Sequence, residues 1–174
     1  MEPIKAQEKK WFVLTIKPRH EKQISKFLTE INIENFVALK KQLRHWHDRK
    51  KWVEMPLFSR YIFIHTLEKD RHRVFEIPNT IKYLSLAGKI CELSENEIAR
   101  VKLLCSYKGE IKIEEGILHT GDQALINKGH FAGMFGQITM NKTKSKIKIN
   151  LPSLGCFAEI EIDKKSVEKI KEKQ

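Results

Sequence analysis

The sequence predicts an α+β fold in two domains, a mixed α/β domain followed by a small β-barrel. Residues 11–16 and 57–66 are apolar runs rich in residues that favour strands. Between them, four apolar residues recur at the spacing of one helix face: Ile24, Phe27, Leu28 and Ile31. Beyond residue 117, short alternating runs are separated by glycine-rich turns, a pattern typical of small barrels.

The first domain is predicted to span residues 1–107, which is long enough to bury a core of its own. A strand over 11–16 leads into a helix over 20–31. Ser94 and Glu97 form a capping box, a reciprocal pair of side-chain to backbone hydrogen bonds, at the start of a helix over 95–107. The remaining expected elements are strands at 35–39, 57–66 and 81–86 and a short helix at 69–76.

A charged segment without large aromatic residues is predicted to link the two domains at 108–117. The second domain then spans 118–174. Apolar and polar residues alternate in KIKINL (146–151) and AEIEID (158–163), as in strands that bury one face. We therefore expect closely spaced strands that form a small barrel.

The composition indicates a globular protein with an anionic partner. The 174 residues are 41% hydrophobic and 32% charged, and the net charge of +11 favours nucleic acid as that partner. No run approaches eighteen consecutive apolar residues, so we expect no membrane contact. Three widely spaced cysteines and the lack of a leader segment indicate reduced thiols in a cytoplasmic protein.

The segment RHWHDRKKW (44–52) raises the question of a metal or catalytic site. His45 and His47 have the spacing of a metal-binding pair, but the cations around them repel a divalent ion. No HExxH, CxxC, phosphate-binding loop or Ser–His–Asp order accompanies them. We therefore expect no catalytic residue, no metal and no cofactor, and we do not expect an enzyme.

Two parts of the sequence resemble the modules of one protein family. GDQALINKGHFAGMFGQI (121–138) resembles the KOW motif, whose matched positions here are Gly121, Asp122, Gly129, Phe131, Gly133 and Gly136. WFVLTIKPRHEK (11–22) and WHDRKKWVEMPLFSRYIFI (46–64) resemble the N-terminal NGN domain of NusG proteins. Both modules, in this order and over nearly the whole chain, identify it as a member of the NusG family, most similar to the specialised RfaH and UpxY-like paralogues.

The resemblance implies both a fold and a function. The first domain would be an NGN-type α/β sandwich, with a mostly antiparallel sheet and flanking helices, and the second an SH3-like KOW barrel. The resemblance further implies a cytoplasmic monomer that binds the clamp helices of RNA polymerase and suppresses pausing or termination. Its barrel recruits a ribosomal protein or a termination factor. An operon-specific antitermination role is favoured, and a KOW-containing RNA- or ribosome-binding protein is the alternative.

The resemblance places polymerase contacts on the strand at 57–66. The matched residues are Leu57, Phe58, Tyr61 and Phe63. Tyr61 and Phe63 share one strand face because side chains alternate, and an apolar face suits a partner's amphipathic helices. The alternative is that both rings belong to the core. If they dock polymerase, replacing both with alanine leaves a folded protein that no longer binds it.

Basic residues in three segments are expected to lie near upstream or non-template DNA. The segment 40–51 carries six cations against Asp48 alone, and phosphate would relieve this crowding. The alternative is a solvated loop. A second group surrounds the start of the first helix, and a third lies on the short helix at 69–76. The residues are Lys40, Lys41, Arg44, Arg49, Lys50 and Lys51, then Lys17, Arg19, His20 and Lys22, then Arg71 and Arg73.

Overall fold

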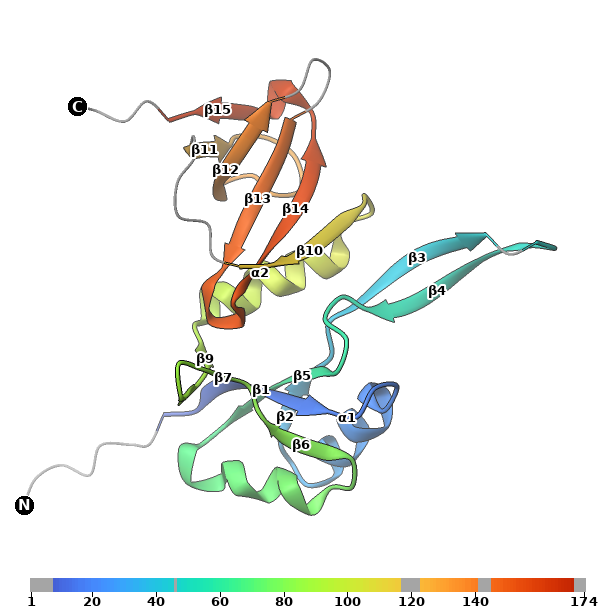
Figure 1. The fold of residues 1–174 in the computed structure, drawn as a ribbon, viewed down its shortest axis with the longest axis vertical. Coiled ribbons are helices and arrows are strands. Elements are labelled where there is room, and N and C mark those ends of the chain that lie inside the picture. Colours follow the sequence, from blue (N-terminus) through green and yellow to red (C-terminus); the bar gives the residue numbers. More distant parts are fainter. Residues whose placement is uncertain (1–7, 46, 117–122, 141–144, 171–174) are drawn as a thin grey trace, which may run out of the picture. The chain divides into compact units, whose positions relative to one another are not determined.

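The computed structural model of the chain divides into two units, Met1–Cys105 and Ser106–Gln174 (Figure 1). It describes residues 8–45, 47–116, 123–140 and 145–170. The first unit combines helices with a five-stranded sheet, and the second is built from six antiparallel strands. This arrangement confirms the predicted α+β class, a mixed domain followed by an all-β domain.

The sheet of the first unit has the strand order β2-β5-β1-β6, and β9 also pairs with β1. The apolar run of β1 is buried on both faces, which suits a central strand. Its antiparallel pairing with β5 sets Val13 opposite Phe63. The strands are β1 (Lys10–Ile16), β2 (Glu34–Phe36), β5 (Tyr61–Thr66), β6 (Thr80–Tyr83) and β9 (Glu92–Leu93), besides a small hairpin of β7 (Ser85–Leu86) and β8 (Lys89–Ile90).

One face of this sheet carries the main core of the unit. The helix α1 (Glu21–Glu30) packs Ile24 and Leu28 against it, and the 3₁₀ helix η1 (Glu68–Glu76) adds Val74. Burying a side chain of this size contributes about 1.5–3 kcal/mol. The predicted apolar stripe is confirmed at Ile24 and Leu28, whereas Phe27 is 37% exposed. The sheet supplies Phe12, Leu14, Ile16, Ile62 and Ile64.

The helix α2 (Glu95–Ser106) lies along the opposite face. Trp11 Nε1 on β1 donates to Glu95 Oε1 at 2.8 Å, and Lys102 Nζ lies 5.4 Å from the centroid of the same indole. The predicted capping box is present, because Ser94 N donates to Glu97 Oε2 at 3.1 Å and Glu97 N donates to Ser94 Oγ at 3.3 Å. With helices on both sides, the central strands are apolar on both faces.

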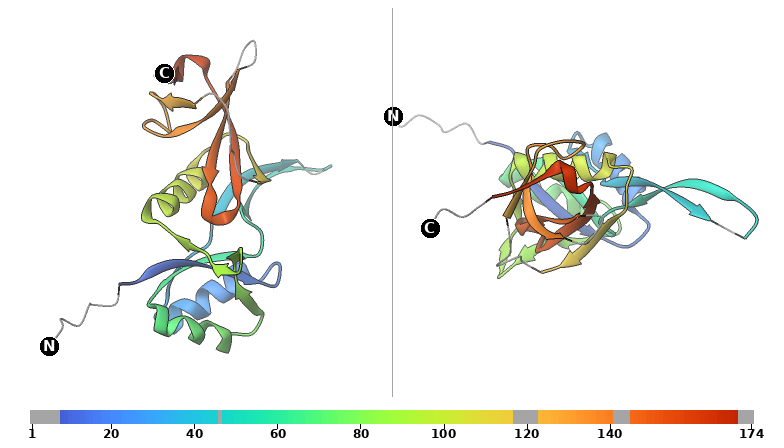
Figure 2. Two further views of the ribbon diagram at one scale, coloured as in Figure 1. Left: turned by 60° about the vertical axis from the view of Figure 1, so that its left-hand side comes forward. Right: turned by 90° about the horizontal axis from the view of Figure 1, so that it is seen from above.

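The strands β3 (Leu39–His45) and β4 (Lys50–Pro56) form a separate hairpin that projects as an arm (Figure 1, Figure 2). Its register sets Leu43 opposite Trp52 and Lys41 opposite Glu54. Most of the basic segment 40–51 is therefore strand rather than loop. The sequence pattern did not predict these strands, because polar residues dominate the ribbon and its few apolar residues do not form a regular alternation.

The sheet of the second unit has the order β10-β14-β13-β12-β11-β15. Along β13, every second side chain is buried, as the alternation in KIKINL predicted. Two 3₁₀ turns, η2 (Pro152–Leu154) and η3 (Lys164–Ser166), follow β13 and β14. The strands are β10 (Ile111–Glu115), β11 (Gln123–Ile126), β12 (Phe135–Met140), β13 (Ser145–Leu151), β14 (Cys156–Ile162) and β15 (Val167–Lys169).

The segment between the domains differs from the expected linker at 108–117. Residues 111–115 form β10, which pairs with β14 and sets Ile111 opposite Ile160 and Ile113 opposite Ala158. The two isoleucines alternate with charged residues, so this short run has the pattern of a strand with one apolar face. The charge of the segment concealed that pattern. The second unit therefore begins at Ser106, twelve residues before the predicted start at 118.

The KOW-like glycines have two different structural roles. Gly129 and Gly133 have φ angles of 88° and 84°, which residues with a side chain rarely adopt. Gly136 lies on β12, and a Cβ there would be 2.6 Å from Ile147 Cγ2 and 2.8 Å from Lys148 O. Phe131 is buried, as the motif implies. Gly121 and Asp122 lie outside the described residues.

Replacing Gly136 with alanine is expected to lower the free energy of unfolding by about 1–3 kcal/mol, the usual cost of overpacking. The added methyl group would overlap a backbone carbonyl of β13, which moves only if the strand pairing shifts. Urea unfolding followed by circular dichroism measures the loss. Gln137→Ala on the same strand is the control and should change stability by less than about 0.5 kcal/mol. Equal urea midpoints for Gly136→Ala and Gln137→Ala would contradict the close approach of Gly136 to the backbone of β13.

Candidate functional site

The aromatic residues of β5 lie on the face opposite the core residues Ile62 and Ile64, because side chains alternate along the strand. Phe63 is 0% exposed, and the rings of Phe36 and Phe58 lie 5.9 and 6.0 Å from its own. Tyr61, at the start of the strand, is half-buried. The structure therefore places Phe63 in the core, while Tyr61 still reaches solvent.

The turn before Tyr61 is held by the start of α1. Arg60 N donates to Glu21 Oε1 at 3.0 Å, and the Glu21 side chain is buried. Arg60 itself has a φ of 70°, so the turn is sharp. Of the other predicted polymerase contacts, Leu57 is half-buried and Phe58 is buried. The sequence analysis missed Glu21, although an acid among cations at the first turn of a helix was a usable signal.

The predicted basic group at the start of α1 is largely exposed. Lys17, Arg19 and Lys22 are exposed, and His20 is half-buried. Arg19 adopts a φ of 67° in the turn that precedes the helix. Glu21, which lies between His20 and Lys22 in the sequence, accepts a hydrogen bond from the turn before Tyr61, so the basic group lies beside the half-buried end of β5.

The same group is joined to the hairpin by an ion pair. Lys22 Nζ lies 2.8 Å from Glu54 Oε2 on β4, and this hydrogen bond lowers the pKa of Glu54. Of the hairpin residues predicted to bind DNA, four are exposed: Lys41, Arg49, Lys50 and Lys51. Arg44 lies on β3. We call the exposed cations of the helix start and the hairpin the basic surface: Lys17, Arg19, Lys22, Lys41, Arg49, Lys50 and Lys51.

Lys40 is placed differently from the rest of the predicted hairpin cations. Its side chain is only 3% exposed, and burial lowers the pKa of its ammonium group. It interacts electrostatically with Cys105 near the end of α2, where burial raises the pKa of the thiol to about 11. Lys40 therefore packs the base of the hairpin into the unit, and this burial argues against the predicted contact with DNA.

Arg71 and Arg73 do not join the basic surface. Arg71 Nη1 lies 3.5 Å from Glu68 Oε1, and Arg73 Nη2 donates to Ile31 O at 3.2 Å. Ile31 follows the last turn of α1, whereas the basic surface surrounds its first turn. Ten helical residues separate these ends by about 15 Å. The structure thus brings two of the three predicted basic groups together and leaves the third apart.

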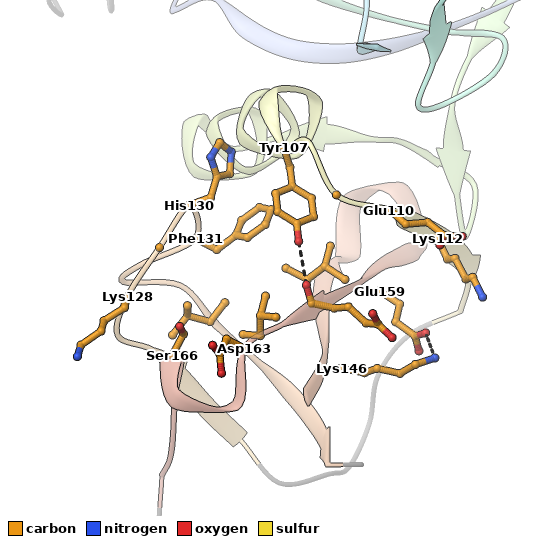
Figure 3. Close-up of a pocket in the computed structure, with 16 residues that line it drawn as sticks. Tyr107, Glu110, Lys112, Lys128, His130, Phe131, Lys146, Glu159, Asp163 and Ser166 are labelled. Atoms are coloured by element: carbon orange, nitrogen blue, oxygen red, sulfur yellow. Dashed lines mark hydrogen bonds and ion pairs between the residues drawn. The ribbon is translucent and has the colours of Figure 1, made fainter. Parts of the chain in front are cut away.

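The second unit contains a pocket of about 720 Å³, lined by β10, β14 and the loop between β11 and β12 (Figure 3). The Tyr107 and Phe131 rings meet there with their centroids 4.8 Å apart. The Tyr107 hydroxyl donates to Glu161 O at 2.8 Å. Lys146 and Glu159 form an ion pair of 2.7 Å at the wall. Charged groups of both signs line the pocket, so its chemistry favours no single class of ligand.

Within the described ranges, no three His, Cys, Asp or Glu side chains gather where they could hold a metal ion. Among the helices that the structure describes, none is long and apolar enough to cross a membrane. The three cysteines, all described, are free thiols.

One solved structure has a similar fold. A structure of Thermotoga maritima NusG matches with a TM-score of 0.53 and 22% identity over 94% of this chain and 98% of that one. Two conformations of the MjSpt4:Spt5 complex match with TM-scores of 0.33 and 0.32, at 13% and 12% identity. Those two matches cover 94% and 92% of this chain and 99% and 97% of theirs. No curated protein sequence matches the chain.

A sequence-family model assigns the first unit. The model described as transcription termination factor nusG matches residues 9–102. This range contains the five-stranded sheet, the start of α1 and the whole β3–β4 hairpin, and it covers more than half of the chain. The chain therefore belongs to the NusG family of transcription factors.

Proposed function

We propose that the chain regulates transcription elongation by binding RNA polymerase and DNA through its first unit. The observation that carries this proposal is the family match, which coincides with the unit that bears β5 and the basic surface. The proposed outcome is suppression of pausing or termination. The net charge of +11 and the basic hairpin support an operon-specific member rather than a general elongation factor.

The polymerase contact is proposed at the end of β5 that reaches solvent. Leu57 and Tyr61 are half-buried there, and the buried rings of Phe58 and Phe63 support them. An apolar edge on a rigid sheet suits an amphipathic helix, and the proposed partner is the pair of clamp helices of RNA polymerase. In this proposal Tyr61 makes contact, whereas Phe63 positions the strand.

The DNA contact is proposed on the basic surface. Lys22 and Glu54 join its two parts, and Glu21 ties it to the turn before Tyr61. Phosphate contacts of this kind supply affinity that does not depend on sequence. Docking on polymerase would hold the surface near upstream or non-template DNA, so weak intrinsic affinity is sufficient.

The second unit is proposed to recruit a further factor, such as a ribosomal protein or a termination factor. Phe157, near the start of β14, is only 7% exposed, and Lys148 Nζ lies 4.5 Å from the centroid of its ring. Phe135 is 58% exposed instead, and it lies opposite Leu125 in the β11–β12 pairing. This apolar spot is the proposed contact for the recruited factor.

Transcription in vitro on templates with a pause site and a terminator tests the proposed function. We expect the protein to shorten the pause or increase read-through on at least one template. Binding to polymerase without a change on any template would remove the regulatory role. Co-purification with ribosomal subunits in place of polymerase would favour the KOW-containing ribosome-binding alternative.

Replacing Tyr61 with alanine is expected to weaken polymerase binding about 30-fold, the effect of losing one aromatic anchor of an interface. Titration of labelled polymerase measures this loss, and circular dichroism checks that the protein stays folded. Phe75→Ala is the matched control, because Phe75 is an exposed aromatic residue on η1, outside the proposed interface. Equal affinity for the two variants would place the polymerase contact elsewhere.

A further inference from the structure

An exposed apolar pair lies in the middle of the basic hairpin. Trp52 is 63% exposed and Leu43 is 41% exposed, and the register of β3 and β4 sets them directly opposite each other. Directly opposite residues project from the same face of a two-stranded ribbon, with Cβ atoms about 4.5–5.5 Å apart. Most of the Trp52 ring is left in solvent, so Trp52 does not anchor the hairpin to the sheet.

Cations flank this pair on the same face. Side chains alternate, so the next pairs on that face are Lys41 with Glu54 toward the base and His45 with Lys50 toward the tip. Glu54 is bonded to Lys22 of α1, which turns this face toward the basic start of the helix. The apolar pair is therefore flanked along the strand by lysines on both sides.

This combination selects a ligand that is both flat and negatively charged. A solvent-exposed indole beside an aliphatic side chain offers a surface for stacking, and the flanking ammonium groups attract phosphate at a few ångströms. An acidic peptide would satisfy the cations but not the ring, and a purely apolar partner would leave the cations without counterions. A nucleic acid strand satisfies both.

We propose that Trp52 and Leu43 form a stacking platform for an unpaired base of single-stranded DNA. In a duplex, each base face is covered by its neighbours, so the indole has access only to an open strand. The choice of DNA rests on the proposed function, because transcription always exposes one unpaired DNA strand beside the polymerase. No hydroxyl or amide side chain among the described residues flanks the pair on its face to select the RNA 2′-hydroxyl.

Binding of the full-length protein to labelled 15-nucleotide strands tests the platform without polymerase. The probes are one mixed-sequence DNA strand, the same sequence as a duplex, and its RNA version. Trp52→Ala is expected to weaken single-strand binding about tenfold, the effect of losing one stacked base. Duplex binding and the salt dependence should not change, because no charge is removed. Trp52→Phe keeps a ring and should stay within about threefold of the parent.

The controls separate stacking from other effects. Phe75→Ala removes an exposed aromatic residue of the same unit from η1, outside the hairpin, and should bind DNA like the parent. A Trp46→Phe background makes quenching of the exposed indole report on Trp52, since Trp11 is buried. Unchanged single-strand affinity for Trp52→Ala, or an equal loss with the duplex, would overturn the platform. RNA binding more tightly than DNA would overturn the proposed ligand.

The outcome can be separated from that of the proposed function. Trp52-dependent DNA binding with no effect on transcription would leave the platform standing and remove the regulatory role. If the parent and Trp52→Ala both alter pausing and bind DNA with equal affinity, the regulatory role stands and the platform is wrong. Melting temperatures of the variants should match the parent, because the side chain is largely in solvent.

Discussion

Replacing Phe63 with alanine is expected to lower the free energy of unfolding by about 3–5 kcal/mol, the usual cost of emptying an aromatic site in a core. The side chain is 0% exposed, and its ring lies among those of Phe36 and Phe58. Val13 occupies the paired position on the central strand and is also buried. These neighbours belong to the sheet or the turn beside it, so they cannot collapse freely into the space.

Such a loss approaches the total stability of many domains, so part of the variant should be unfolded at 37 °C. Urea unfolding followed by far-ultraviolet circular dichroism measures the change. Tyr61→Ala is the matched control on the same strand face, and we expect it to cost about 1 kcal/mol because its ring is only half-buried.

This expectation changes the test that the sequence suggested. A double variant lacking both rings was expected to stay folded and lose only polymerase binding, but the burial of Phe63 makes unfolding the expected result. The single Tyr61 variant therefore tests docking, and the Phe63 variant tests the core. If Phe63→Ala unfolds at the parent's urea concentration yet no longer binds polymerase, its ring is a contact residue and the core assignment is wrong.

The secondary structure was predictable where one face of an element is apolar. The recurrence of Ile24 and Leu28 gave α1, and Ser94 with Glu97 gave the start of α2, because both signals are local. The β3–β4 hairpin and β10 were not predicted, since polar residues dominate both. Their strands are defined by pairing with a partner, which a local pattern does not show.

The functional surface was predictable in composition but not in exposure. Alternation correctly set Tyr61 and Phe63 on one face, yet it did not show that one ring is covered and the other is not. A run of charge likewise gives no sign that Lys40 turns inward while Lys41 turns outward. In each case the difference depends on how distant segments pack.

Replacing Arg49, Lys50 and Lys51 together with glutamine is expected to weaken binding of single-stranded DNA about 100-fold at 0.1 M salt. Each phosphate contact on a single strand contributes about 0.7 to the slope of log affinity against log salt, so three lost contacts lower the slope by about 2. The three residues are exposed near the tip of the hairpin, where Asp48 is the nearest acid in sequence. Polymerase binding through Tyr61 should be unchanged.

A second triple variant separates a local surface from overall charge. Lys69, Lys82 and Lys89 are exposed in the same unit but lie on η1, β6 and β8, away from the hairpin. Replacing them with glutamine removes the same net charge and should lower the salt slope by less than about 0.5. Equal losses for both triples would mean that DNA responds to the net charge of +11 as a whole. A loss of DNA affinity confined to the hairpin triple would mean that the cations of the arm contact the phosphates directly. These cations would then be neutralised only where a nucleic acid strand lies against them.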